Sequence, residues 1–171
     1  LVDEGPKPLF IRNALSPINK FNKDGFEYCE FGNLNPNKTF YVINRSSHAG
    51  IFSYLSFVLN HLVIAKQHEF IPVVDMQNFT NPYNEKNIID NTLNSWEYYF
   101  DQTSNYELKE VYKSKNVIFS RNDYNANMNY MVHLEPKFRE FKDKEIKLKK
   151  KYIDYVDKYY EKNNLLNQNI L

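Results

Sequence analysis

The chain has 171 residues, a formal net charge of +1 and 42% hydrophobic residues, with 14 tyrosines and 13 phenylalanines. These values suit one domain with a ring-rich core, and they offer no overall attraction to nucleic acid or to an anionic membrane. A single cysteine, Cys29, excludes an internal disulfide, and no stretch approaches the roughly 18 apolar residues of a membrane span. We therefore expect a cytoplasmic protein with no membrane span and no nucleic-acid partner.

Residues 1–37 form an irregular lead-in, because prolines and glycines interrupt its short apolar pieces. Within it, the alternation of aromatic and polar residues over 25–31 is typical of a short hairpin strand. The polar run at 33–37 then predicts a turn that leads into the next strand. The remainder, residues 38–171, is expected to be one Rossmann-like domain.

Three segments of this domain predict a parallel crossover. Residues 38–44 and 70–76 are apolar runs that predict buried strands. Between them, apolar residues at helical spacing predict an amphipathic helix over 51–69: Ile51, Leu55, Val58, Leu62 and Ala65. A strand, a helix of this length and a second strand form a right-handed crossover, so the two strands should run parallel. The expected fold class is α/β, with a Rossmann-like parallel sheet flanked by helices.

The rest of the domain is polar and rich in rings. Residues 77–106 predict a long loop, which usually has a functional role or contains short helices. Its rings, Trp96 among them, either pack as a small core or stack on a sugar. Residues 116–120 predict a third strand. From Pro136 to Asn163 the chain predicts a charged helix with a solvated outer face. Its buried stripe is expected to consist of Phe138, Phe141, Leu148, Tyr152, Tyr155 and Val156.

The turn before the helix at 51–69 is the leading candidate site, because open α/β sheets bind ligands beyond the carboxyl ends of their strands. A serine in this turn can cap the helix, and Gly50 supplies either an unusual φ or the absence of a side chain. Amides at a helix start favour an anion, so six residues are candidates to bind a donor phosphate: Ser46, Ser47, Ala49, Gly50, Ile51 and Phe52. A tight structural turn is the alternative, because the chain contains neither GxGxxG nor a P-loop motif.

Four further residues carry side chains suited to chemistry. His48 lies in the same turn and carries an imidazole that can take up or donate a proton, so it is either a general base or phosphate donor, or a loop histidine bonded to backbone. Asp75 ends the second strand, and with Gln77 and Asn78 it either binds an acceptor hydroxyl or caps the next turn. The remaining histidines show no metal-ligand spacing, so we expect no metal and no cofactor.

Three ordered segments carry a resemblance: FYVINRSSHAGIFS at 40–53, PVVDMQN at 72–78 and NSWEYYF at 94–100. Together they resemble the N-terminal half of a bacterial glycosyltransferase. The group is similar to the α-1,6-fucosyltransferases, the nodulation fucosyltransferases and the protein O-fucosyltransferases. The resemblance covers about residues 38–120.

This resemblance implies a GT-B-like enzyme with two Rossmann-like halves and no metal. Such an enzyme transfers a sugar from a nucleotide sugar, such as GDP-fucose, to a glycan or another hydroxyl acceptor. It also implies that the loop at 46–52 faces the donor phosphates and the acceptor, and that His48 is the candidate base. The family's donor-gripping strand, His-x-Arg followed by Asp, is absent. We therefore expect an N-terminal half that lacks its C-terminal donor-binding domain and is inactive alone.

Two other functions stay open from the sequence. Sulfotransferases also place Arg-Ser in a strand-to-helix turn and Arg-Asn after a later strand, as at Arg45–Ser46 and Arg121–Asn122 here. However, the first turn lacks the Ser/Gly-Thr-Thr continuation of those enzymes. A resemblance to sulfotransferases also does not account for the segment at residues 72–100. The third possibility is a non-catalytic α/β domain that binds a glycan or a protein.

Overall fold

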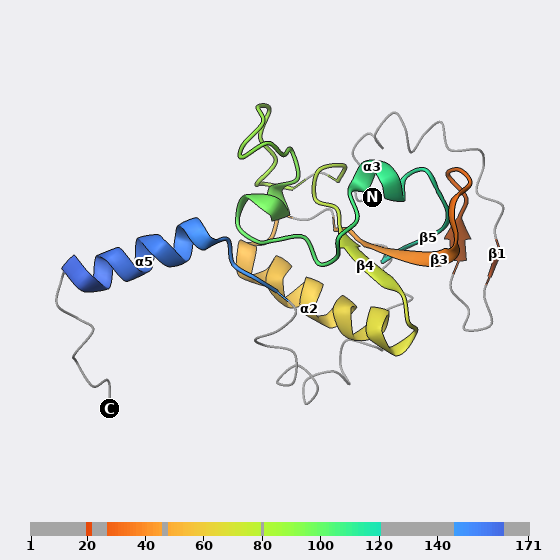
Figure 1. The fold of residues 1–171 in the computed structure, drawn as a ribbon, viewed down its shortest axis with the longest axis horizontal. Helices are drawn as coiled ribbons and strands as arrows, with labels where there is room; N and C mark the ends of the chain where they lie inside the picture. Colours follow the sequence, from red (N-terminus) through yellow and green to blue (C-terminus); the bar gives the residue numbers. More distant parts are fainter. Residues whose placement is uncertain (1–19, 22–26, 46–47, 80, 121–145, 163–171) are drawn as a thin grey trace.

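The structure is a computed structural model that describes residues 20–21, 27–45, 48–79, 81–120 and 146–162 (Figure 1). The described strands form a five-stranded sheet of order β1-β2-β5-β3-β4. Strand β3 pairs in parallel with both β4 and β5, and β1 and β2 continue the sheet beyond β5 as antiparallel strands. The strands are β1 (Lys20–Phe21), β2 (Glu27–Cys29), β3 (Leu34–Ile43), β4 (Ile71–Val74) and β5 (Ser114–Phe119).

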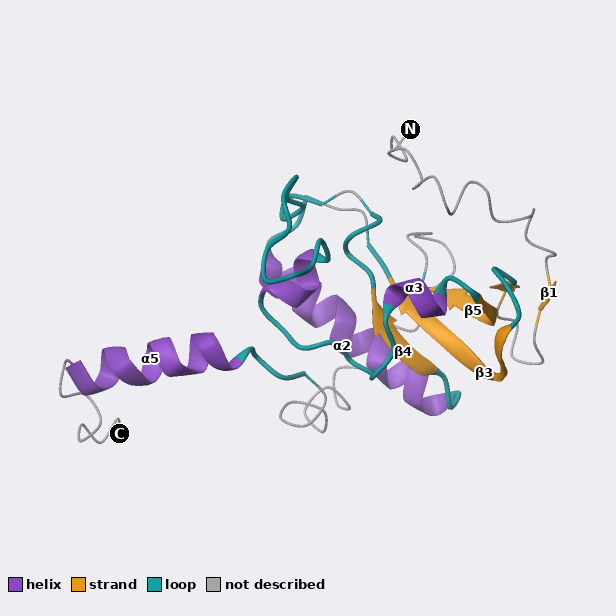
Figure 2. Cartoon of the chain, turned by 45° about the horizontal axis from the view of Figure 1, so that its top comes forward, coloured by secondary structure: helices purple, strands orange, loops and turns teal. Residues whose placement is uncertain are grey.

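The three parallel strands confirm the predicted α/β, Rossmann-like fold. The chain runs from β3 through α2 (Ile51–Gln67) to β4, and then back past β3 to β5 through a segment that contains α3 (Leu108–Val111). The two helices lie on opposite sides of the sheet (Figures 1 and 2). Because successive strand residues point to opposite faces, β3 supplies a core on each side.

Each face of the sheet has its own buried cluster. Tyr41 and Ile43 of β3 pack with α2, together with Tyr54, Val58, Leu62, Ala65, Val74, Met76, Trp96 and Ile118. Phe40 and Val42 pack on the α3 side, together with Val73, Val111 and Val117. The helix predicted at 51–69 and the parallel pairing of its two strands are therefore confirmed, and Trp96 is a core residue rather than an exposed platform.

The predicted turn at 33–37 is wrong, because β3 already begins at Leu34. The pairing of β3 with β5 is irregular between Leu34 and Thr39, where several residues of β3 lie opposite few of β5. Asn35 has a positive φ of 49° and donates its side-chain amide to Glu110 and Ser114. These contacts with residues far away in the sequence hold the polar run in the sheet.

The long segment at 77–106 covers the outer edge of β4. The Gln102 side chain accepts a hydrogen bond from the Val74 amide and donates one to the Val74 carbonyl. The Asn94 side chain bonds to the same strand end, since it accepts a hydrogen bond from the Met76 amide and donates one to the Val74 carbonyl. These bonds occupy backbone groups that an edge strand otherwise presents to other chains. As predicted, the segment includes a short helix, η1 (Ser95–Tyr98).

The last described helix is α5 (Lys150–Lys162), which projects away from the sheet (Figure 1). No residue of α5 is buried, so the predicted buried stripe is wrong within the described residues. Tyr155 is 71% exposed and Val156 45%, and Leu148 before the helix is also exposed. Phe138 and Phe141 lie outside the described residues. Nowhere in the described ranges is a helix both long and apolar enough to cross a membrane.

Candidate functional site

The carboxyl ends of the three parallel strands carry buried polar residues. Asn44 follows β3, Asp75 follows β4 and Ser120 follows β5, and each is at most 6% exposed. The Asn44 amide donates to Ser120 Oγ at 2.9 Å, and the Ser120 hydroxyl donates to the Asn44 carbonyl at 3.1 Å. The parallel strands are ordered β5-β3-β4, so the chain passes from β3 to the neighbour on one side and later to the neighbour on the other side. Folds of this kind bind ligands at the carboxyl ends of the strands, beside the point where the strand order reverses.

Asp75 is fully buried and accepts four hydrogen bonds. Its Oδ1 accepts from the backbone amides of Gln77 and Asn78, both at 3.0 Å. Its Oδ2 accepts from the Asn78 side chain at 2.8 Å and from the Tyr112 hydroxyl. Burial raises the pKa of Asp75 above its ordinary value, although all four donors favour the charged form and oppose that shift. Burial and the neighbouring carboxylate also raise the pKa of Tyr112.

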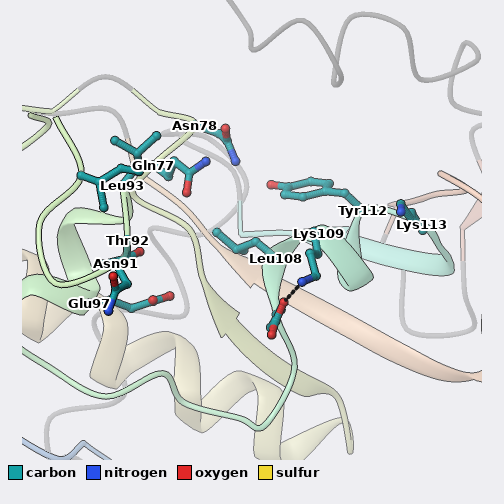
Figure 3. Close-up of a pocket in the computed structure, with 12 residues that line it drawn as sticks. Gln77, Asn78, Asn91, Thr92, Leu93, Glu97, Leu108, Lys109, Tyr112 and Lys113 are labelled. Atoms are coloured by element: carbon teal, nitrogen blue, oxygen red, sulfur yellow. Dashed lines mark ion pairs between the residues drawn. The ribbon is translucent and has the colours of Figure 1, made fainter. Parts of the chain in front are cut away.

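Two residues that bond to this carboxylate, Asn78 and Tyr112, line a pocket of about 720 Å³ (Figure 3). Its walls come from the segment after β4, from the turn around residue 91 and from α3. The lining residues are Gln77, Asn78, Ile88, Asn91, Thr92, Leu93, Glu97, Glu107, Leu108, Lys109, Tyr112 and Lys113. Gln77 and Asn78 thus line the pocket, whereas Asp75 lies behind them and holds their turn. The structure brings these three predicted acceptor residues together, and their role in binding stays a prediction.

Three of the four charged side chains that line the pocket have polar partners. Glu107 forms an ion pair with Lys109 at 2.6 Å, and Glu97 accepts hydrogen bonds from two side-chain amides. Because the Asn78 amino group is taken by Asp75, its Oδ1 is the atom that can accept from a ligand. With the exposed Gln77 amide beside it, the pocket is suited to bind hydroxyl groups rather than a strongly charged ligand.

The turn before α2 differs from its prediction in two ways. The N-cap of α2 is Gly50, with no side-chain capping bond, so the expectation that a serine caps the helix is wrong. Ser46 and Ser47 lie outside the described residues. Gly50 has φ −70° and ψ 161°, which any residue adopts, and a Cβ there would meet only Tyr83 Oη at 3.9 Å. Neither an unusual φ nor a lack of space therefore requires this glycine.

The start of α2 nevertheless has an electropositive character. Its first amides have no carbonyl partner within the helix, and its first turn contains no acidic residue. The Arg45 guanidinium donates to Ser53 Oγ at 3.1 Å and so lies beside this first turn. His48 is exposed, and Phe52 is 80% exposed. None of the described residues of this turn lines the pocket, so the donor candidates form a separate group from the acceptor candidates.

Sequence reasoning missed Tyr112, Asn44 and Ser120. The two strand-end residues had a usable signal, since each is the first polar residue after a buried strand. Tyr112 had none, because its bond to Asp75 joins residues far apart in the chain. Within the described ranges, the His, Cys, Asp and Glu side chains form no group of three that could hold a metal ion. Comparison of the chain with protein-family models, with curated proteins and with solved structures finds no match.

Proposed function

We propose that the chain is the acceptor-side part of a cytoplasmic, fucosyltransferase-like glycosyltransferase. It would transfer a sugar from a nucleotide sugar, with GDP-fucose as the first donor to test, to a hydroxyl of a glycan or another acceptor. The single cysteine is compatible with a reducing cytoplasm. The acceptor would lie in the pocket beside Gln77 and Asn78, and the donor phosphates would lie near the start of α2.

One observation carries this proposal: an amide-lined pocket opens at the carboxyl edge of a parallel sheet. Gln77 and Asn78 line it, and the buried Asp75 holds them in place. Amides donate and accept at once, which suits hydroxyl groups that do the same. Ligand pockets of α/β folds occur at this edge, and their volumes commonly lie between about 300 and 1,000 Å³.

The donor side is supported by the electrostatics of α2. An uncapped helix start with no acid in its first turn favours a phosphate, and Arg45 adds a fixed positive charge nearby. His48 precedes this helix and is exposed to solvent, and we assign it the role of general base for an acceptor hydroxyl that extends from the pocket toward this turn. Its ring would accept the proton that the acceptor hydroxyl loses as it attacks the sugar.

The test measures transfer from radiolabelled GDP-fucose to a mixture of oligosaccharides, with the 171-residue chain and with the full product of its gene. We expect transfer by the full product and little or none by the chain alone. His48→Ala should lower kcat at least tenfold, whereas His68→Ala, at the opposite end of α2, should leave it unchanged. Gln77→Ala should raise KM for the acceptor, with the exposed Gln67→Ala as its matched control.

Three outcomes contradict the proposal. Stabilisation by adenosine phosphosulfate but not by GDP-sugars would favour a sulfotransferase. Saturation-transfer NMR that shows glycan contacts with no nucleotide effect, even in the full product, would favour a non-catalytic binding domain. Transfer that Gln77→Ala and Gln67→Ala affect equally would remove the pocket from the acceptor site.

A further inference from the structure

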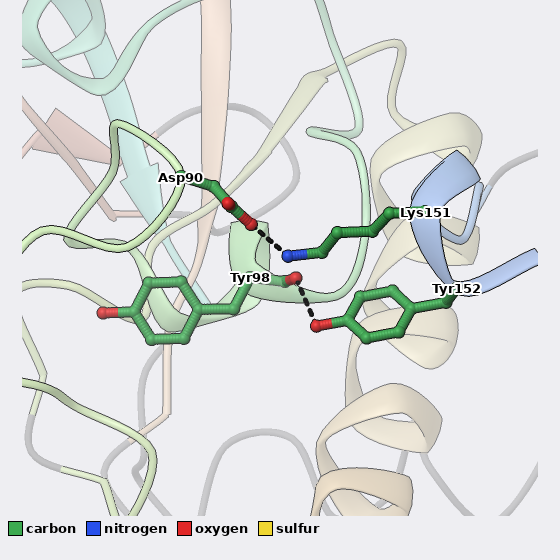
Figure 4. Close-up of polar contacts among 4 residues, drawn as sticks. All are labelled: Asp90, Tyr98, Lys151 and Tyr152. Atoms are coloured by element: carbon green, nitrogen blue, oxygen red, sulfur yellow. Dashed lines mark hydrogen bonds and ion pairs between the residues drawn. The ribbon is translucent and has the colours of Figure 1, made fainter. Parts of the chain in front are cut away.

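Among the residues that the structure describes, helix α5 contacts the body of the protein through its first turn. The Lys151 ammonium forms an ion pair with Asp90, and the Tyr152 hydroxyl donates to the Tyr98 carbonyl at 3.1 Å (Figure 4). The Tyr152 ring also stacks on Tyr99, with ring centroids 5.8 Å apart. Beyond this turn the helix projects from the body, as both views of the fold show (Figures 1 and 2).

The projecting part of α5 has one apolar face and one charged face. Apolar and aromatic residues recur at helical spacing and share one side of the helix: Tyr152, Ile153, Tyr155, Val156, Tyr159 and Tyr160. All of them except Tyr152 are exposed in the structure. The other side carries only lysines and acidic residues. A face of this kind gains free energy when another apolar surface covers it.

The charge of this segment indicates what covers the face. Residues 146–162 contain six lysines and three acidic residues, a net charge of +3, whereas the whole chain has +1. Lys158 and Lys162 stand three and seven residues after Tyr155, so they border the apolar face along one row. Lysines in that position bury their stems and extend their ammonium groups to the level of lipid phosphates.

We propose that α5 docks on an anionic membrane surface, with its tyrosine-rich face at the headgroup boundary and its lysines on the lipid phosphates. Tyrosine favours this boundary because one end of the side chain is apolar and the other is polar. A second copy of the chain is a poorer occupant, because pairing two copies would bring two segments of net charge +3 together. The docking concerns a helix that lies on the membrane, and it is independent of the proposed transfer reaction.

The experiment is co-sedimentation of the 171-residue chain with vesicles. Vesicles of phosphatidylcholine alone are compared with vesicles that contain about one third phosphatidylglycerol. We expect binding to the anionic vesicles to be on the order of 20-fold stronger, and to weaken as salt screens the lysines. The paired change Lys158→Gln and Lys162→Gln should remove most of this preference. The pair Tyr155→Ser and Val156→Ser should abolish binding to either vesicle.

Matched controls separate docking through α5 from nonspecific binding to vesicles and from misfolding. Lys113→Gln with Lys115→Gln removes two exposed lysines elsewhere, and Ile88→Ser removes an aliphatic side chain that is 67% exposed. Both should bind vesicles as the wild type does. The α5 variants should keep the melting temperature of the wild type, because α5 contributes no buried residue. Equal binding to both kinds of vesicle, or none, would overturn the proposal. So would a dimer, seen by light scattering, that the Tyr155 and Val156 changes convert to a monomer.

Discussion

The Tyr112 hydroxyl donates a hydrogen bond to the buried carboxylate of Asp75, and this bond joins the end of α3 to the carboxyl end of β4. The other three donors to that carboxylate belong to Gln77 and Asn78, which lie two and three residues after it in the chain. Tyr112 is thus the donor that connects the turn after β4 to another element. It fixes one wall of the pocket relative to the other.

Replacement of Tyr112 by Phe should destabilise the protein. The change removes a hydrogen bond to a buried charged group, which contributes about 1.5–3 kcal/mol. Tyr106→Phe is the matched control, because its hydroxyl accepts only an exposed bond from Lys38, so the loss there should stay below about 0.5 kcal/mol. Urea denaturation of both variants measures the difference. Equal losses would show that the Asp75 contact contributes no more than a surface one.

Replacement of Asp75 by Asn should change the pH dependence of stability. The folded pKa of Asp75 lies above the unfolded pKa. The contribution of Asp75 to the free energy of unfolding is therefore complete below the unfolded pKa, and it is lost as pH rises through the folded pKa. Asn carries no titrating proton. The free energy of unfolding of Asp75→Asn, relative to wild type, should therefore shift in the variant's favour as pH rises above about 4, the ordinary pKa of an aspartate. Urea melts across this range test it, and a flat difference would contradict the raised pKa.

The parts of the fold that could be predicted are those that the local spacing of apolar residues indicates. Helix α2 begins at Ile51 as predicted, because apolar residues at helical spacing mark it without reference to the rest of the chain. The start of β3 was missed because Asn35 and Asn116 hold it through bonds to distant residues. The buried stripe of α5 was predicted wrongly for a related reason. Amphipathic spacing shows which side of a helix is apolar, but not whether the protein itself covers that side.

The residues of the candidate site also fall into those that a local sequence pattern predicts and those that it does not. Asp75, Gln77 and Asn78 could be predicted because a polar run directly after an apolar strand places them at the sheet edge. The conformational reason given for Gly50 was wrong, since a glycine in a turn does not reveal its φ or its neighbours. Tyr112 depends on a contact across 37 positions of the chain, which no local pattern encodes.

Two glycine variants should have opposite effects. At Gly32 an added Cβ would lie 2.4 Å from the Lys113 carbonyl oxygen, and a backbone atom cannot easily give way. Gly32→Ala should therefore destabilise the protein by about 1–3 kcal/mol. Gly50→Ala meets ordinary contact distances at a normal φ, so it should be neutral or stabilising by up to about 1 kcal/mol. Thermal denaturation compares them, and a larger loss at Gly50 would contradict the geometry.

His61 should make stability fall in mild acid. Burial in α2, with a smaller effect of the Arg45 charge, lowers its pKa to about 4, and its Nδ1 shares a hydrogen bond of 2.8 Å with the Tyr41 hydroxyl. The unfolded chain takes up this proton near pH 6.5, so stability is full above 6.5 and declines as pH falls toward 4. The loss amounts to about 3 kcal/mol. His61→Asn should show a smaller decline over this range in urea melts, although its smaller side chain lowers stability at neutral pH.

Asn94 should be among the most sensitive positions outside the apolar core. Its side chain accepts from the Met76 amide at 3.0 Å and donates to the Val74 carbonyl and to Glu97, at 2.8 and 2.9 Å. Because Asn94 is 1% exposed, no water replaces these partners when Ala removes the amide. We expect Asn94→Ala to cost about 2–4 kcal/mol and to increase aggregation, since it uncovers part of the β4 edge. Asn87→Ala, at an exposed position nearby, should change neither the urea midpoint nor light scattering. If both variants aggregate alike, the cover over β4 is not what keeps the edge from pairing.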